Sequence, residues 1–137
     1  MKRNILSVIV GLATAIITFL IAETINTSLH PAPTSLDFKN SIAVKLFYEN
    51  QPLSFWLMVL LGWVVGSFLC GLLIKWISKN DDKKLPIIAG CLLTLSAVAN
   101  FFSLPHPTWF IIVGLLIFIP STLLGHKLYK SDTNGHR

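Results

Sequence analysis

Charged residues are scarce in this chain, since only 12% of its 137 residues are Asp, Glu, Lys or Arg. Acidic residues are the scarcer kind, with six against eleven basic ones. Hydrophobic residues make up 53% of the chain and the mean hydropathy is +0.70. These values are too apolar for an ordinary soluble domain. The sequence therefore predicts a membrane protein.

Several motifs that carry enzymatic chemistry are also missing. The sequence contains no glycine-rich dinucleotide motif, Walker motif, HExxH zinc motif or nucleophile elbow. Its two cysteines, Cys70 and Cys91, form no CxxC pair, and we interpret them as two small, buried apolar side chains on neighbouring helices. We therefore predict a protein that is not an enzyme and that has no cofactor and no metal.

Four apolar segments are long enough to cross a hydrocarbon core of roughly 30 Å as helices. Their helical form is required because lipid cannot satisfy exposed backbone groups. The first segment is longer than the core of a signal peptide, so we interpret it as a retained anchor. The sequence thus predicts an all-α, antiparallel bundle of four transmembrane helices in one domain, 1–137, with helices at about 5–25, 53–77, 85–104 and 108–129.

The distribution of Lys and Arg predicts the orientation. Cytoplasmic loops of membrane proteins carry an excess of basic residues. Lys39 and Lys45 fall in the first loop, 26–52, and the other nine basic residues flank the opposite helix ends. We therefore expect a multi-pass protein of the inner (plasma) membrane with both termini and the tail, 130–137, in the cytoplasm. This topology explains the basic excess, so nucleic acid is not expected as a partner.

Aromatic residues near the ends of the predicted helices support this layout. Interfacial Trp and Tyr residues commonly anchor transmembrane helices at the lipid headgroups. Trp56 and Trp109 lie near the predicted external ends, and Trp76 and Tyr129 lie near the cytoplasmic ends. We interpret all four as interfacial anchors.

The first external loop is the only connection long enough for structure of its own. Thr34 and Asp37 have the spacing of a capping box. Apolar residues recur after them at helical spacing, namely Ile42, Ala43, Leu46 and Phe47. We predict a short amphipathic helix on the external surface. An irregular loop that covers the bundle is the alternative.

Small residues indicate how the helices pack, because helix association in lipid depends on close backbone approach. Gly62, Gly66, Ser67 and Gly71 give the second transmembrane helix two small-residue pairs, of which the first is a GxxxG motif. We interpret these residues as packing seams within one chain. A homo-oligomer built on Gly62 and Gly66 is the alternative.

Polar residues gather near the predicted external end of the bundle. The topology brings Glu23, His30, Asn100 and His106 to one depth, and an ionisable residue within a spanning segment indicates a functional site. A carboxylate and histidines could bind a proton or a cation there. The other interpretation is a polar latch, in which Glu23 is hydrogen-bonded to Asn100 or a histidine. Zinc is less well supported, because the spacing is not specific.

Four segments of the chain resemble a group of small, uncharacterised four-helix bacterial membrane proteins: "ETINTSLHPAPTSLDF", "LLGWVVGSFLCGLL", "NFFSLPHPTWF" and "IPSTLLGHKL". The resemblance covers most of the chain and implies the four-helix topology and a bacterial inner membrane. It implies no activity and no catalytic residue. The residues that carry it include Glu23, His30, Asp37, Asn100, Pro105, His106, Pro107 and Trp109.

Two functions follow from these observations. The first is a non-enzymatic structural or binding role, in which the external cluster stabilises the bundle or binds a partner, a lipid headgroup or a small ion. The second is a small oligomeric transporter or channel for protons or cations. Thr14, Thr18 and Thr94 are the polar residues nearest mid-membrane, which disfavours a pore within one chain.

Overall fold

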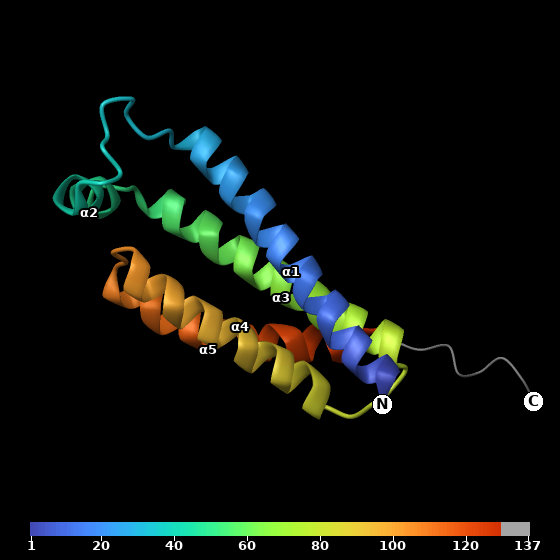
Figure 1. Cartoon of the computed structure of the whole chain (residues 1–137). Coiled ribbons are helices and arrows are strands. Elements are labelled where there is room, and N and C mark those ends of the chain that lie inside the picture. Colours follow the sequence, from blue (N-terminus) through green and yellow to red (C-terminus); the bar gives the residue numbers. More distant parts are fainter. Residues whose placement is uncertain (130–137) are drawn as a thin grey trace, which may run out of the picture.

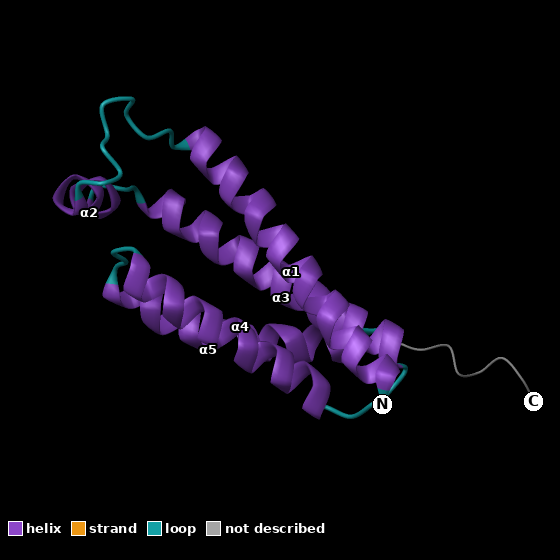
Figure 2. Cartoon of the chain, in the orientation of Figure 1, coloured by secondary structure: helices purple, strands orange, loops and turns teal. Residues whose placement is uncertain are grey.

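The computed structural model describes residues 1–129, and this part of the chain contains five α-helices and no strand (Figure 2). The predicted tail, 130–137, lies outside the described residues. Four of the helices are long and apolar enough to cross a membrane, which confirms the predicted all-α architecture. The helices are α1 (Lys2–Leu29), α2 (Ser41–Glu49), α3 (Leu53–Ser78), α4 (Lys84–Ser103) and α5 (Thr108–Leu128).

The first helix is longer than the apolar segment that predicted it. Its polar last turns are helical as well, and the hydroxyls of Thr24 and Ser28 are satisfied within the helix, since they donate to Leu20 O and Thr24 O, both at 2.8 Å. The helix ends just before His30, which precedes Pro31, and a proline disfavours helical backbone in the residue before it. Glu23 is therefore inside the helix, six residues before its last residue, Leu29.

The predicted amphipathic helix exists as α2, but its cap is not the predicted one. The side chain of Asn40 accepts hydrogen bonds from the backbone N–H groups of Ile42 and Ala43, as an N-cap residue does. The capping box of Thr34 and Asp37 was therefore wrong. The Asp37 carboxylate instead accepts from the backbone of Lys39, in the turn before the helix.

The buried side of α2 is rotated from the predicted face. Ile42 is 70% exposed and Leu46 is 54% exposed, whereas Phe47 and Tyr48 are half-buried. Tyr48 packs edge-on against Phe55 of α3, with ring centroids 6.1 Å apart. One face of α2 thus contacts the bundle, and the other leaves apolar side chains exposed.

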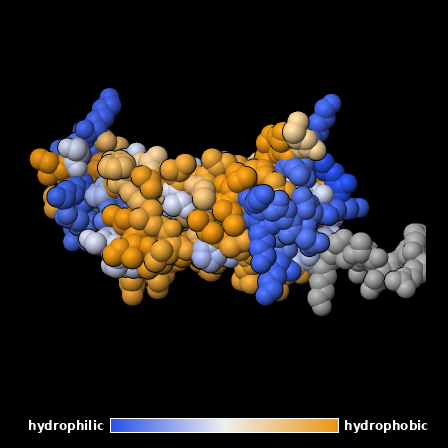
Figure 3. Space-filling view, turned by 90° about the horizontal axis from the view of Figure 1, so that it is seen from below, coloured by the Kyte–Doolittle hydropathy of each residue, from blue (hydrophilic) through white to orange (hydrophobic). Residues whose placement is uncertain are grey.

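The two helix pairs α1–α3 and α4–α5 run side by side (Figure 1). α3 is central, because it contacts α1 and α5 extensively and α4 less. Arg3 Nε donates to Ile77 O at 2.6 Å, which joins the start of α1 to the end of α3. An apolar surface separates two hydrophilic ends of the molecule (Figure 3), as expected for a membrane-spanning bundle.

Small residues of α3 lie where other helices approach it most closely. A Cβ atom placed on Gly62 would overlap Ala22 of α1, and one on Gly66 would lie 3.1 Å from Ala15 O, also in α1. A Cβ on Gly71 would overlap the Thr122 carbonyl of α5, and Ser67 is fully buried. Because α1 already covers Gly62 and Gly66, a homodimer built on this GxxxG motif would have to displace α1.

The second half of α5 crosses toward α3 after Pro120 (Figure 1). Thr122 lies at this crossing and is fully buried. Its hydroxyl donates to Pro86 O of α4 at 3.0 Å and to Ile119 O at 2.9 Å. Both cysteines are free thiols, and Cys70 is buried as predicted. The predicted burial of Cys91 was wrong, because its side chain is exposed.

Candidate functional site

A cavity of about 120 Å³ lies at the end of the bundle that carries α2. We call it the Glu23 cavity. Its walls come from the long helices α1, α3 and α4, from the short helix α2, and from the turn that joins α4 to α5. The lining residues are Phe19, Ala22, Glu23, Asn26, Thr27, Tyr48, Phe55, Trp56, Val59, Trp63, Asn100, Leu104 and His106.

Three of the four residues of the predicted polar cluster line this cavity. Glu23 comes from α1, Asn100 from α4 and His106 from the turn after α4. The fourth, His30, does not line it. Its ring lies behind Phe55, with centroids 5.6 Å apart in an edge-on arrangement. The topology thus brings Glu23, Asn100 and His106 around one space and leaves His30 outside it.

The predicted latch, in which Glu23 bonds to Asn100 or a histidine and ties α1 to the turn between α4 and α5, does not form within residues 1–129. A different polar latch joins α1 to α3. Asn26 is 1% exposed, and its amide donates to Phe55 O at 3.2 Å. His30 Nδ1 lies 3.1 Å from the Asn26 side-chain oxygen, and His30 Nε2 lies 3.1 Å from Ser54 Oγ. Glu23 forms no side-chain hydrogen bond or ion pair within residues 1–129, so its carboxylate is available to a ligand.

His106 faces the cavity as a neutral ring at neutral pH. Burial lowers the pKa of its imidazole, and the hydrogen bond to Leu104 O opposes this in part. Nδ1 lies 2.6 Å from that carbonyl, which can only accept, so Nδ1 carries the hydrogen. In the neutral ring, Nε2 is then left as an acceptor.

The pKa of Tyr48 depends in part on the charge of Glu23. Burial raises the pKa of the Tyr48 phenol, and the Glu23 carboxylate raises it further. The phenol is therefore protonated at neutral pH and can donate a hydrogen bond. Glu23 is the one carboxylate among the described residues that line the cavity, and none of them is a lysine or an arginine.

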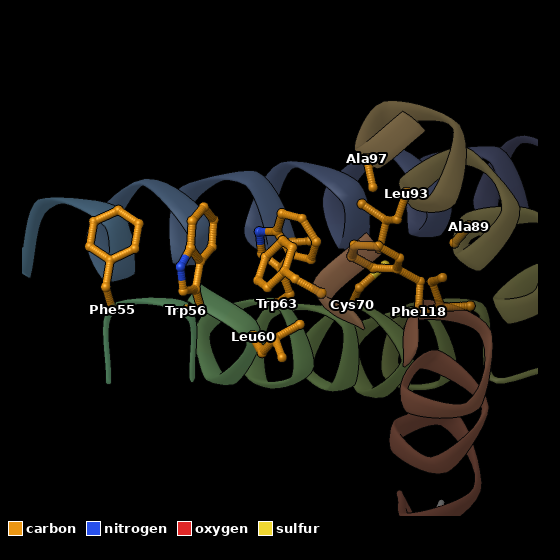
Figure 4. Close-up of a cluster of buried hydrophobic side chains, with 12 residues drawn as sticks. Phe55, Trp56, Leu60, Trp63, Cys70, Ala89, Leu93, Ala97 and Phe118 are labelled. Carbon is orange, nitrogen blue, oxygen red and sulfur yellow. The ribbon is translucent and has the colours of Figure 1, made fainter. Parts of the chain in front are cut away.

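Five of the thirteen residues that line the cavity are Phe, Tyr or Trp. Figure 4 shows Phe55, Trp56 and Trp63 following one another along α3. Trp56 is only 4% exposed and packs against His106 and Phe110, at ring distances of 5.5 and 5.0 Å. Its interpretation as an interfacial anchor was therefore wrong, because a buried ring cannot lie among lipid headgroups.

Trp63 is the residue of α3 that lines the Glu23 cavity furthest from the end that carries α2. Its ring is 7% exposed and lies 5.2 Å from Phe110, 5.3 Å from Phe118 and 5.9 Å from Phe101. Gly114 leaves room for this ring, since a Cβ there would lie 2.9 Å from Trp63 Cζ3. Below Trp63, the hydroxyls of Thr14, Thr18 and Thr94 donate to carbonyls of their own helices.

The lowered pKa of His106 makes stability depend on pH. The unfolded chain takes up a proton on this ring near pH 6.5, and the folded chain takes it up at lower pH. The stability that comes from the neutral ring is therefore complete above about pH 6.5 and is lost as pH falls through the folded pKa. We expect the thermal midpoint of the wild type to fall over this window more steeply than that of His106→Gln. Equal slopes would show that His106 does not titrate differently on folding.

Sequence reasoning missed the aromatic half of the site. Tyr48 was not considered, and Trp56 was assigned to the lipid interface. The available signal was the close spacing of Phe55, Trp56, Val59 and Trp63, which places these residues near one face of α3. Within residues 1–129, no group of three or more His, Cys, Asp or Glu side chains could hold a metal ion.

Comparisons with known proteins leave the resemblance to small four-helix bacterial membrane proteins as a prediction. The chain matches no protein-family model, no curated protein and no solved structure.

Proposed function

We propose that this multi-pass membrane protein is a non-enzymatic binding protein that holds a small organic cation in the Glu23 cavity. The main observation behind this proposal is that the Glu23 carboxylate, which has no hydrogen-bond partner within residues 1–129, lines a cavity with aromatic walls. No lysine or arginine is among the described residues that line this cavity. Glu23 and His106 are not hydrogen-bonded to each other, so neither activates the other for catalysis. The arrangement therefore supports binding better than chemistry.

The walls suit a cation because of their electrostatics. The face of an aromatic ring carries partial negative charge and attracts an ammonium group, most strongly for Trp. Trp56, Trp63 and Tyr48 contribute such rings, and Glu23 contributes a full negative charge. The acceptor Nε2 of neutral His106 also favours a ligand that brings positive charge or hydrogen-bond donors.

The size of the cavity limits the ligand to a few heavy atoms. Its volume of about 120 Å³ is slightly below that of a cavity of roughly 150 Å³ that accepts benzene. A methylated or primary amine is of this size. The Trp63 ring lines this cavity and packs against Phe110 and Phe118, so we expect the ligand to enter and leave on the same side. This packing favours binding over the alternative of transport through one chain.

Calorimetric titration of the protein in nanodiscs tests this proposal. We expect choline to bind and its uncharged analogue, with carbon in place of nitrogen, to bind at least about tenfold more weakly. Glu23→Gln should weaken choline binding on the order of tenfold or more, since it removes a charge-assisted contact. The matched control is Glu49→Gln, because Glu49 is an exposed carboxylate of α2 outside the cavity.

The proposal fails if choline and its neutral analogue bind equally, or if Glu23→Gln and Glu49→Gln have the same effect. In the first case the cavity recognises shape alone. In the second case Glu23 acts only through the general surface charge.

We also propose that the chain lies in the inner membrane with both termini in the cytoplasm and the Glu23 cavity outside. The excess of Lys and Arg at the other end supports this orientation. In a variant without the native cysteines, Ser35→Cys should react with an impermeant maleimide in intact cells, whereas Lys83→Cys should not. The reverse labelling pattern would invert the orientation.

A further inference from the structure

A second cavity lies at the opposite end of the bundle, between the ends of α3 and α5 and the turn that joins α3 to α4. Its volume is about 400 Å³. We call it the basic pocket. Its lining residues are Lys75, Asp81, Lys83, Pro120, Leu123, Leu124, His126, Lys127 and Tyr129.

Positive charge dominates the polar side of the basic pocket. Three lysines, Lys75, Lys83 and Lys127, face one carboxylate, Asp81. Lys75 is only 5% exposed, although a lysine is rarely buried without a strong partner. Its partner Asp81 has a side chain that is 97% exposed. The Lys75 ammonium has three donors, so an incoming anion can share it with Asp81.

The remaining charged and titratable groups do not reverse this balance. The hydrogen bond and charge of Lys75 lower the pKa of Asp81, so this carboxylate stays ionised and holds Lys75 in place. Asp82 lies in the same turn, and its carboxylate accepts from the backbone of Lys84. His126 Nε2 lies 3.1 Å from Asn80 O and must carry the hydrogen there.

The other side of the basic pocket is apolar. Pro120, Leu123 and Leu124 line it from α5, and Leu124 is 51% exposed on the surface of a helix long and apolar enough to span the membrane. The pocket therefore joins a cationic wall to the apolar flank of the bundle.

We propose that the basic pocket binds the phosphate headgroup of an anionic phospholipid, with an acyl chain along Leu123 and Leu124. Basic pockets between transmembrane helices suit such headgroups, because several cations can share the phosphate oxygens. A free phosphate would use the lysines but not the apolar wall. The combination of the two walls therefore favours a lipid, and this site is separate from the Glu23 cavity.

Lipid retention measured by native mass spectrometry tests the proposal. The protein is taken from nanodiscs of phosphatidylcholine with phosphatidylglycerol. We expect the wild type to retain phosphatidylglycerol preferentially, and the double variant Lys83→Gln/Lys127→Gln to retain it on the order of tenfold less. The control double variant is Lys79→Gln/Lys84→Gln, which removes the same charge from exposed lysines outside the pocket. Its loss should stay below about threefold.

Two further comparisons distinguish a lipid site from a phosphate site and from general attraction to an anionic surface. Equal losses in the two double variants would overturn the proposal, because they would show general attraction to an anionic surface. Leu124→Ser should weaken retention of phosphatidylglycerol without changing the binding of inorganic phosphate in pure phosphatidylcholine nanodiscs. If inorganic phosphate displaces the lipid and Leu124→Ser has no effect, the site is a phosphate site and the lipid assignment is wrong.

Discussion

Gly71→Ala is expected to separate α3 from α5 and to lower the free energy of unfolding by about 3 kcal/mol, the upper end of the usual range for overpacking. The added methyl group would overlap the backbone carbonyl of Thr122. That carbonyl cannot retreat easily, because the fully buried Thr122 is itself bonded to Pro86 O of α4. Alanine is the better helix former, so intrinsic propensity alone predicts the opposite change.

Reversible unfolding in mixed micelles measures this effect. The control is Val65→Ile, which enlarges a side chain that is 41% exposed on the same helix and should change stability by less than about 0.5 kcal/mol. A Gly71→Ala protein as stable as the wild type would show that α3 and α5 do not approach as closely as described.

Gly125 gives a second test of the close contact between α3 and α5. A Cβ on Gly125 of α5 would overlap the Phe68 carbonyl of α3. Gly71 and Gly125 thus face each other's helix across one interface, and a methyl group at either position forces the same displacement. The double variant Gly71→Ala/Gly125→Ala should therefore cost less than the sum of the single variants.

The sequence predicts the four long helices because their apolar segments match the thickness of a bilayer. Their partners are harder to predict. Consecutive helices with short turns are expected to be neighbours, yet α3 contacts α4 less than it contacts α1 and α5. The small residues Gly62 and Gly71 show that two helices approach α3 closely, but nothing in their spacing says which helix meets which.

The candidate site could be predicted only in part, because the sequence indicates the depth of a residue in the membrane but not the rotation of its helix. Depth in the membrane follows from topology, so Glu23, Asn100 and His106 could be assigned to one level. The rotation of each helix about its axis depends on packing, and this decides that Asn26, rather than Glu23, is buried as the latch. It also turns Trp56 inward, which an aromatic residue near a helix end does not reveal.

Trp63→Ala is the second substitution with a large expected effect. Trp63 packs among the three rings Phe101, Phe110 and Phe118, and removing a buried Trp leaves a void that these rings cannot fill. We expect a loss of about 3 kcal/mol in the free energy of unfolding. Trp76→Ala is the matched control, since Trp76 is on the same helix and is 53% exposed. Its removal should cost well under half as much, because few protein contacts are lost.

The same variant should also change what the Glu23 cavity accepts. Because Trp63 is the lining residue of α3 furthest from the end that carries α2, Trp63→Ala should deepen the cavity. It should therefore raise the binding of tetraethylammonium relative to choline in calorimetric titration. Trp76→Ala should leave that ratio unchanged. If Trp63→Ala lowers stability but not this selectivity, Trp63 is a packing residue alone, and another side chain sets the depth of the cavity. If Trp63→Ala changes both the stability and the ligand selectivity, and Trp76→Ala changes neither, then the packing of Trp63 determines which ligand sizes the cavity admits.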